Sequence, residues 1–129
     1  VETTGNNVNT SARAIALAGT LLSLSAVVLA AMGSHLIDMD GLQGIWQIAS
    51  NIHLFSAAAL LGLAALLTRL ESTPLKWGSW LIVLGTIIFC GSIYLHVISG
   101  RTVPGVTPSG GLLMMAGWLL SSLAFLRKP

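Results

Sequence analysis

The positions of the charged residues constrain this sequence more than any other feature. Asp, Glu, Lys and Arg are absent from four long stretches, at 14–37, 41–68, 77–100 and 102–126. Each stretch exceeds the roughly 20 apolar residues that cross a hydrocarbon core about 30 Å thick. Because water is absent from such a core, every backbone N–H must be paired within its own segment, which requires a helix. The sequence therefore predicts a chain that crosses a membrane four times.

The fold class that follows is an all-α membrane protein with one transmembrane domain. Only 8% of the residues are charged and the mean hydropathy is +0.86, whereas a soluble domain carries about 25% charged residues. We predict a flexible polar N-terminal segment at 1–11 and a transmembrane domain at 12–129. The four transmembrane helices are predicted at about 12–33, 49–69, 77–99 and 110–127. Short linkers place sequence neighbours side by side, in an up-down-up-down bundle.

The basic residues orient this bundle in the membrane. Five of them fall on one side: Arg13, Arg69, Lys76, Arg127 and Lys128. The loops on the other side hold only Arg101, together with Asp38 and Asp40. Because Lys and Arg concentrate in cytoplasmic loops, we predict that both termini are cytoplasmic. The loops at 34–48 and 100–109 should then face the periplasm or its equivalent.

The first outer loop, at 34–48, is not a plain linker. Apolar and aromatic residues recur in and after it at helical spacing: Leu42, Ile45, Trp46, Ala49 and His53. This spacing predicts a short amphipathic helix at the interface, leading into the second transmembrane helix. The four tryptophans, at positions 46, 77, 80 and 118, are expected to anchor helix ends in the headgroup layer.

Small side chains are spaced so that helices can approach closely. In the first helix they follow a heptad pattern: Ala12, Ala16, Gly19, Ser23, Ala26, Ala30 and Gly33. The second helix offers Ala58 and Gly62, and the third offers Gly85, Cys90 and Gly91. In lipid, van der Waals contact between such surfaces replaces the hydrophobic effect as the force between helices. We therefore expect Cys90 to be a packing residue.

Three histidines carry the strongest suggestion of chemistry. His35, His53 and His96 all fall near the outer membrane face, in the layer that also holds residues 38–40. Imidazole is the commonest side-chain metal ligand and also binds haem iron, so a metal or haem site is one interpretation. The alternative is that each ring bonds a backbone carbonyl or an interfacial water. No HxxxH pair favours the metal.

The hairpin between the last two helices gathers polar and turn-forming residues. Tyr94, Ser92 and Thr107 are expected to form a polar cluster around it. Pro104 and Pro108, with the glycines between them and after them, predict a tight turn and then a helix start. Nucleophilic catalysis needs a base and an orienting group beside the nucleophile, and none is evident. We therefore expect no enzyme activity and no catalytic residues.

The hairpin residues resemble those of a known family. The resemblance lies in Phe89, Gly91, Ser92, Tyr94, Gly100, Thr107-Pro108, Gly110-Gly111 and Ala116-Gly117-Trp118, and earlier in Gly33-Ser34-His35 and His53-Leu54-Phe55. This pattern is similar to the small membrane-protein family catalogued as domain of unknown function 423, whose eukaryotic relative is the transmembrane protein 256 family. The resemblance spans about residues 14–126. It implies a multi-pass integral membrane protein of about four helices, in a bacterial inner membrane or, in a eukaryote, a mitochondrial membrane. It implies no established reaction.

Two positions depart from the family's pattern. Family members usually have a histidine where this chain has Ser56, and an apolar residue where it has His96. If the histidines of the family serve a shared site, the resemblance implies that this site is altered here.

Three functional hypotheses from different classes follow. The leading one is an accessory or structural subunit of a larger membrane complex, for example a respiratory or other redox enzyme, with the bilayer and other membrane subunits as partners and no cofactor. The alternatives are a metal- or haem-binding protein that uses the three histidines, and a small homo-oligomeric channel or carrier. No carboxylate lies within a predicted span to favour proton coupling. A net charge of +2 is too small for a nucleic-acid partner.

Overall fold

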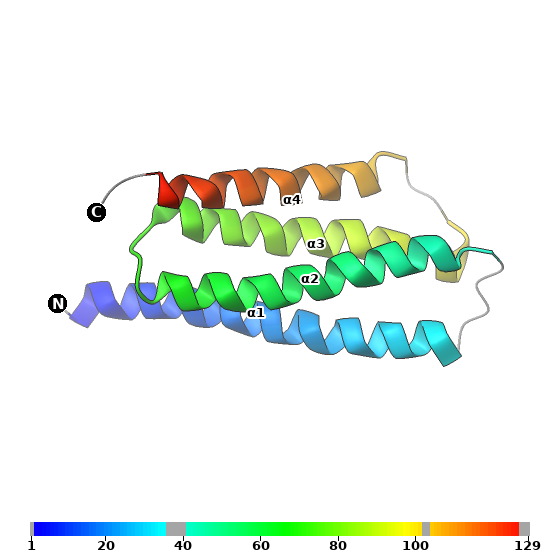
Figure 1. Cartoon of the computed structure of the whole chain (residues 1–129), viewed down its shortest axis with the longest axis horizontal. Helices are drawn as coiled ribbons and strands as arrows, with labels where there is room; N and C mark the ends of the chain where they lie inside the picture. Colours follow the sequence, from blue (N-terminus) through cyan, green and yellow to red (C-terminus); the bar gives the residue numbers. More distant parts are fainter. Residues whose placement is uncertain (1, 36–40, 102–103, 127–129) are drawn as a thin grey trace.

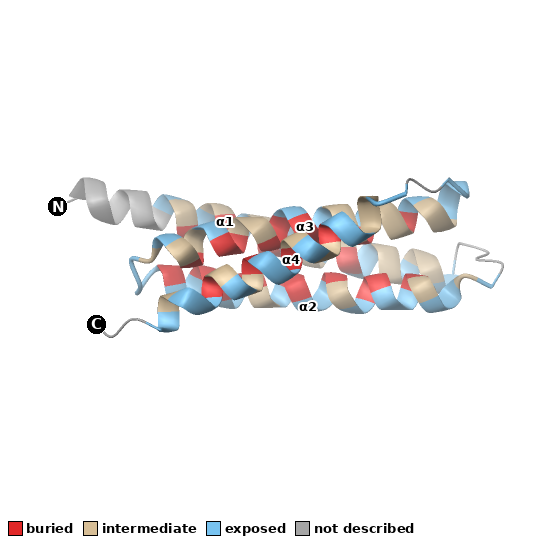
Figure 2. Ribbon diagram, turned by 90° about the horizontal axis from the view of Figure 1, so that it is seen from above, coloured by how far each residue is buried: buried red, intermediate tan, exposed pale blue. Residues whose placement is uncertain are grey.

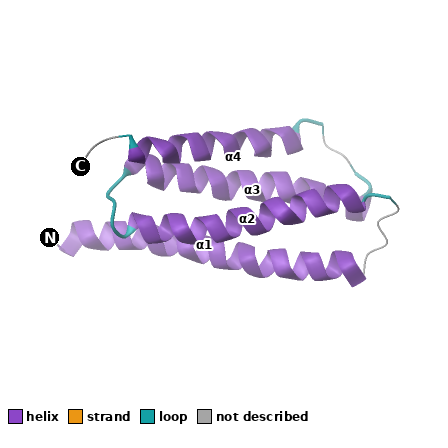
Figure 3. Ribbon diagram, in the orientation of Figure 1, coloured by secondary structure: helices purple, strands orange, loops and turns teal. Residues whose placement is uncertain are grey.

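The chain folds into four long helices that lie side by side (Figure 1). This computed structural model describes residues 2–35, 41–101 and 104–126, with side chains described from Thr10 onwards. The elements are α1 (Glu2–His35), α2 (Gln43–Leu67), α3 (Thr73–Ser99), α4 (Val106–Ser122) and a final 3₁₀ turn, η1 (Leu123–Phe125). The described ranges contain no strand (Figure 3). All four α-helices are long and apolar enough to cross a membrane, which confirms the predicted fold class.

The first two helices begin earlier than predicted. α1 is helical from Glu2, so the predicted N-terminal segment at 1–11 overlaps its first turns, and the part able to span a membrane is Thr10–His35. α2 begins at Gln43, so the segment predicted as a separate interfacial helix is instead the first turns of α2. No proline interrupts the chain between 41 and 67, so one continuous helix runs through both parts.

The last two helices also begin earlier, and in both cases the cap explains the start. Ser72 caps α3, since its Oγ accepts from Leu75 N at 3.3 Å. Gly105 precedes α4 with a φ of 85°, a conformation that glycine adopts without strain. Pro108 then lies in the first turn of α4, where a helix tolerates proline because the missing N–H has no partner there. The residues from 106 to 109, predicted as part of the turn, are therefore helical.

The helices form two antiparallel hairpins, α1–α2 and α3–α4, which meet along α2 and α3. α4 packs along α3 and reaches α2 only through side chains, such as Met114 near Ser56. Both chain ends lie at one end of the bundle, called the terminal end below (Figure 1). The last turns of α1 and α3 lie at the opposite end, called the hairpin end. This is the predicted up-down-up-down order; the membrane side that each end faces stays a prediction.

Buried residues occur along all four helices (Figure 2), and the hydrophobic ones form two clusters. The cluster at the terminal end consists of aliphatic side chains such as Ile15, Leu60 and Ile82. The cluster at the hairpin end contains Trp46, Ala49, Cys90 and Tyr94. The small-residue seam predicted for α1 faces inward, because all its members are buried or half-buried: Ala12, Ala16, Gly19, Ser23, Ala26, Ala30 and Gly33.

The two hairpins differ in how closely their helices approach. A Cβ added to Gly117 of α4 would lie 2.7 Å from Gly78 O of α3, and one added to Gly85 of α3 would lie 2.6 Å from Met114 N of α4. α3 and α4 therefore touch backbone to backbone. Between α1 and α2 the tightest glycine is Gly19, where an added Cβ would lie 3.2 Å from the nearest atom. That distance asks a neighbour to move by only a few tenths of an ångström.

Candidate functional site

A chain of polar side chains crosses the bundle near the hairpin end. Ser25 Oγ of α1 lies 3.1 Å from Nε2 of His53 on α2, and Nδ1 of the same ring lies 3.0 Å from the hydroxyl of Tyr94 on α3. His53 is only 4% exposed and Tyr94 only 6%. Buried polar groups are costly when unpaired, so this Ser25–His53–Tyr94 triad ties three helices together in one register.

Counting protons assigns the donors of the triad. Ser25 Oγ also lies 3.0 Å from Leu22 O, and because a carbonyl only accepts, Ser25 donates its single proton there. Ser25 then accepts from Nε2–H of His53, and Nδ1 of His53 accepts from the Tyr94 hydroxyl. With this neutral imidazole, neither ring nitrogen has a free lone pair. The triad thus holds three helices in place, and its imidazole presents no open metal ligand.

Trp46 covers the triad toward the start of α2. Its ring centroid lies 4.7 Å from that of Tyr94, with the planes at 59°, and Trp46 is buried. Cys90 packs beside it and donates from Sγ to Ala49 O at 3.4 Å. Cys90 is thus the packing residue that was predicted. Trp46 is a core residue and not the exposed anchor that was predicted, whereas Trp77 is exposed near the start of α3.

The structure does not bring the three histidines together. His35 is exposed at the end of α1, His53 is held in the triad, and His96 is half-buried near the end of α3. Within the described ranges, no three His, Cys, Asp or Glu side chains are grouped closely enough to hold a metal ion. Residues 38–40, expected in the same layer, lie outside these ranges. Of the three histidines, only His53 forms hydrogen bonds with described side chains, those of Ser25 and Tyr94.

The polar cluster predicted around the α3–α4 hairpin is found in part. Ser92 Oγ lies 2.5 Å from Thr107 Oγ1 and also donates to Phe89 O at 2.9 Å. Tyr94 belongs to the triad instead. The helical periodicity of α3 explains this separation, because positions 92 and 94 point to different faces of one helix.

The other residues predicted for packing take several roles. Gly100 ends α3 in the left-handed region, at a φ of 75°. A Cβ added to Gly111 would be in ordinary van der Waals contact with the Phe89 ring. The Trp118 ring lies 5.8 Å from that of Phe55, which links α4 to α2. Gly91 is exposed, and nothing lies within 4 Å of the position its Cβ would take. Gly91 therefore packs against no helix of this chain.

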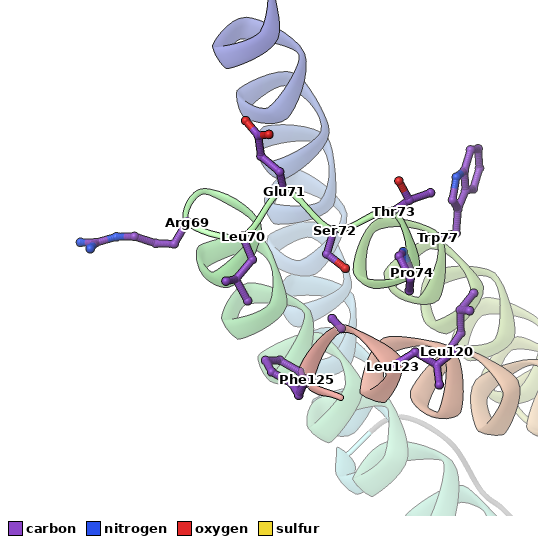
Figure 4. A pocket seen from close by; sticks show the side chains of 11 residues that line it. Arg69, Leu70, Glu71, Ser72, Thr73, Pro74, Trp77, Leu120, Leu123 and Phe125 are labelled. Atoms are coloured by element: carbon purple, nitrogen blue, oxygen red, sulfur yellow. The ribbon is translucent and has the colours of Figure 1, made fainter. Parts of the chain in front are cut away.

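Cavities open at the terminal end and along both hairpins. The one at the terminal end has a volume of about 830 Å³ and lies between the α2–α3 loop and the end of α4 (Figure 4). Leu123 and Phe125 border its opening, whereas Arg69 and Trp77 point away from it. A groove of about 570 Å³ lies between α1 and α2. A third cavity, of about 420 Å³, lies between α3 and α4 at the hairpin end.

Two residues of structural importance were missed by the sequence reasoning. Ser25 gave no local signal, because its partner His53 is 28 positions away. Gly78 did leave a signal. It precedes Gly85 by seven residues, as Gly110 precedes Gly117, and this shared heptad spacing is typical of two helices in close contact.

Comparison with known proteins places the chain in a family. The family model described as "Protein of unknown function (DUF423)" matches residues 29–111. The inner membrane protein YgdD of Escherichia coli K12 is 35% identical over 105 residues, which cover 78% of this chain and 80% of YgdD. The membrane protein SAB0533 of Staphylococcus aureus is 33% identical over 115 residues, 82% of this chain and 89% of the relative. No solved structure matches the chain.

These matches cover most of the chain, and the relatives are named as membrane proteins. The four apolar helices agree with those names. The chain is therefore a small multi-pass integral membrane protein that belongs to the DUF423 family.

Proposed function

We propose that this protein is a non-catalytic accessory subunit of a larger complex in the inner membrane, and that it docks there through α2. In this role it contacts lipid and partner helices, carries out no reaction and holds no cofactor of its own. The observation that carries the proposal is the outward face of α2. Ala58, Gly62 and Ala65 are all exposed on this face, and we call them the α2 stripe.

No contact with a described residue requires a glycine at position 62. Nothing lies within 4 Å of the position its Cβ would take, so alanine fits there. Glycine in a helix interior costs about 1 kcal/mol relative to alanine. A glycine in place of alanine does not improve contact with lipid chains, whereas it lets a partner helix come into close van der Waals contact. The stripe therefore has the chemistry of a face that packs against another helix.

A groove beside the stripe supports the same role. The groove of about 570 Å³ between α1 and α2 is lined by small side chains, among them Ala12, Ala16, Ala64 and Ala65. Ala65 belongs to both the groove and the stripe. A single partner helix that crosses α2 at this point would meet both surfaces.

Extraction in a mild detergent, followed by native gel electrophoresis and mass spectrometry, tests the accessory role. We expect the chain, whose own mass is 13.4 kDa, to migrate in a larger species together with other membrane proteins. Migration as a lone monomer in every mild detergent would reject the proposal. A larger species made only of copies of this chain would also contradict it, and would favour self-assembly instead.

A pair of matched variants tests the docking face. Gly62→Leu is expected to release the chain from its partners, because the bulky side chain prevents close approach of a helix. Ala116→Leu is the control, since Ala116 is also a small exposed residue within a membrane-spanning helix, but on α4. Both variants should keep the helix content of the wild type by circular dichroism. If both or neither lose the partners, α2 is not the docking face.

A further inference from the structure

The cavity between α3 and α4 at the hairpin end joins an apolar wall to a polar rim. Its volume of about 420 Å³ lies within the range of about 300–1,000 Å³ that small-molecule sites occupy. Ile87, Ile88 and Val106 contribute to the wall, and His96 and Arg101 contribute to the rim. The described lining residues include no carboxylate, and Arg101 is the one formally charged residue among them.

The polar groups at the rim differ in how much of their hydrogen-bonding capacity the protein already uses. Ser92 donates its proton to Phe89 O, and the Thr107 hydroxyl then donates to Ser92 Oγ, 2.5 Å away. Both hydroxyl protons are thus used within the protein. His96 Nδ1 is buried without a hydrogen-bond partner, and Arg101 forms no ion pair with any described residue. The Arg101 guanidinium is therefore the rim group with unused capacity that a ligand in the cavity can reach, whereas the buried Nδ1 of His96 is not exposed to it.

The depths of the rim and the wall differ in the way that an amphiphile requires. His96 lies in the last turn of α3, and Arg101 follows the residue that caps this helix, so both belong to the boundary between membrane and water. Ile87 lies about 13 Å deeper along α3, at 1.5 Å per residue. The site thus offers a cation at headgroup level and an apolar surface at acyl-chain level.

We propose that this cavity binds one anionic phospholipid, with the phosphate at Arg101 and the upper acyl chain against Ile87 and Ile88. The apolar wall alone cannot select a lipid, because every acyl chain fits it equally well. Selection comes from the rim, because the Arg101 guanidinium attracts a headgroup with a net negative charge, whereas the headgroup of a zwitterionic lipid carries its own cation beside the same phosphate. The start of α4 has no side-chain cap, so its free N–H groups favour an anion there as well. This site is separate from the α2 stripe and does not depend on the proposed function.

Native mass spectrometry of the full chain, reconstituted with equal amounts of phosphatidylglycerol and phosphatidylcholine, tests the proposal. The wild type is expected to retain one phosphatidylglycerol in preference to phosphatidylcholine. Arg101→Gln should lower this preference about tenfold, because the variant no longer carries the charge that favours the anionic headgroup. Arg69→Gln removes the same charge at the terminal end, where the side chain points away from the nearby cavity (Figure 4), and should leave the preference unchanged.

A second variant tests the apolar part of the site. Ile87 lines the cavity and is exposed, so Ile87→Trp is expected to fold with unchanged helix content and to lose the retained phosphatidylglycerol. Equal retention of both lipids by the wild type would overturn the proposal. Equal loss in the two arginine variants would show a general charge effect and would overturn it too. A lipid-free dimer with Ile87 at its interface, detected by photocrosslinking, would assign the cavity to a second copy instead.

Discussion

The two hairpins of this protein are held together in different ways. In α3–α4 the backbones touch, because Gly78 and Gly85 face Gly110 and Gly117 with no room for a Cβ between them. In α1–α2 the contact runs through side chains such as Ile15 and Leu60, which are fully buried. The first kind of contact specifies one partner at one register, since backbone atoms cannot be repacked. The second tolerates change, since side chains can adjust.

The looser hairpin has a compensating tie. In the 18-residue apolar window of α1 only 17% of the residues are buried, against 44% in that of α2. Packing alone therefore holds α1 weakly. The Ser25–His53–Tyr94 triad connects α1 through α2 to α3. We therefore predict that substituting the contact glycines destabilises the α3–α4 hairpin. Substituting the polar residues of the triad weakens the connection between the two hairpins.

The largest effect is expected from Gly117→Ala. The new Cβ would meet Gly78 O at 2.7 Å and Ile82 N at 2.9 Å, and relief requires the two helices to separate. We expect a loss of about 3 kcal/mol in the free energy of unfolding, measured by circular dichroism as the fraction of denaturing detergent rises in mixed micelles. Gly91→Ala is the control, because its Cβ position is open. Equal effects of the two substitutions would break the comparison between the hairpins.

The next effect is expected from His53→Ala. The substitution leaves a cavity and removes the partner of both Ser25 and Tyr94, so we expect a loss of about 2 kcal/mol in the same titration. Leu54→Ala, at an exposed position on the same helix, controls for the loss of side-chain volume. A double variant with Ser25→Ala should cost less than the sum of its parts. Strict additivity would show that the two residues are not coupled.

Tyr94→Phe isolates one bond of the triad. The ring that stacks on Trp46 is kept, and only the hydroxyl that donates to His53 Nδ1 is lost. We expect a loss of about 1 kcal/mol, again from the detergent titration. An unchanged or raised stability would mean that this hydrogen bond contributes nothing, and that the tie between α2 and α3 is made by ring packing.

The smallest effect is expected from Gly19→Ala. The added Cβ would lie 3.2 Å from Ala57 O and 3.3 Å from Leu60 Cβ, so the neighbours shift slightly. The gain in helix propensity of about 1 kcal/mol offsets this strain, and the net change should stay within about 0.5 kcal/mol. A cost near that of Gly117→Ala would show that the α1–α2 contact is as intolerant as the α3–α4 contact.

The spans and their order could be predicted because one physical rule decides them. Charges such as Arg69 and Arg101 are too costly inside lipid, so they mark where helices end. The inward seam of α1 could be predicted for a similar reason, since its heptad spacing is local in the sequence. Helix starts were less predictable, because they depend on the side-chain cap of Ser72 at α3 and on the left-handed backbone of Gly105 before α4.

The candidate site could not be predicted to the same degree. His53 was singled out for its residue type, but its partners lie 28 and 41 positions away, and no periodicity connects them. Trp46 was assigned to the membrane surface because tryptophans at helix ends usually lie there, and the tertiary contact with Tyr94 overrides that tendency. Ser92 and Thr107 were paired correctly because a short hairpin forces their helices together.

The triad also has a consequence for the synthesis of the protein. A ribosome completes α1 and α2 before α3 exists, so the nascent chain contains Ser25 and His53 well before Tyr94. During this interval Nδ1 of His53 is an acceptor without a donor inside the bilayer, and a polar group in that condition is costly. The arrival of α3 removes the deficit. A nascent chain that stops before α3 therefore keeps an unpaired hydrogen-bond acceptor at His53, which the complete chain lacks.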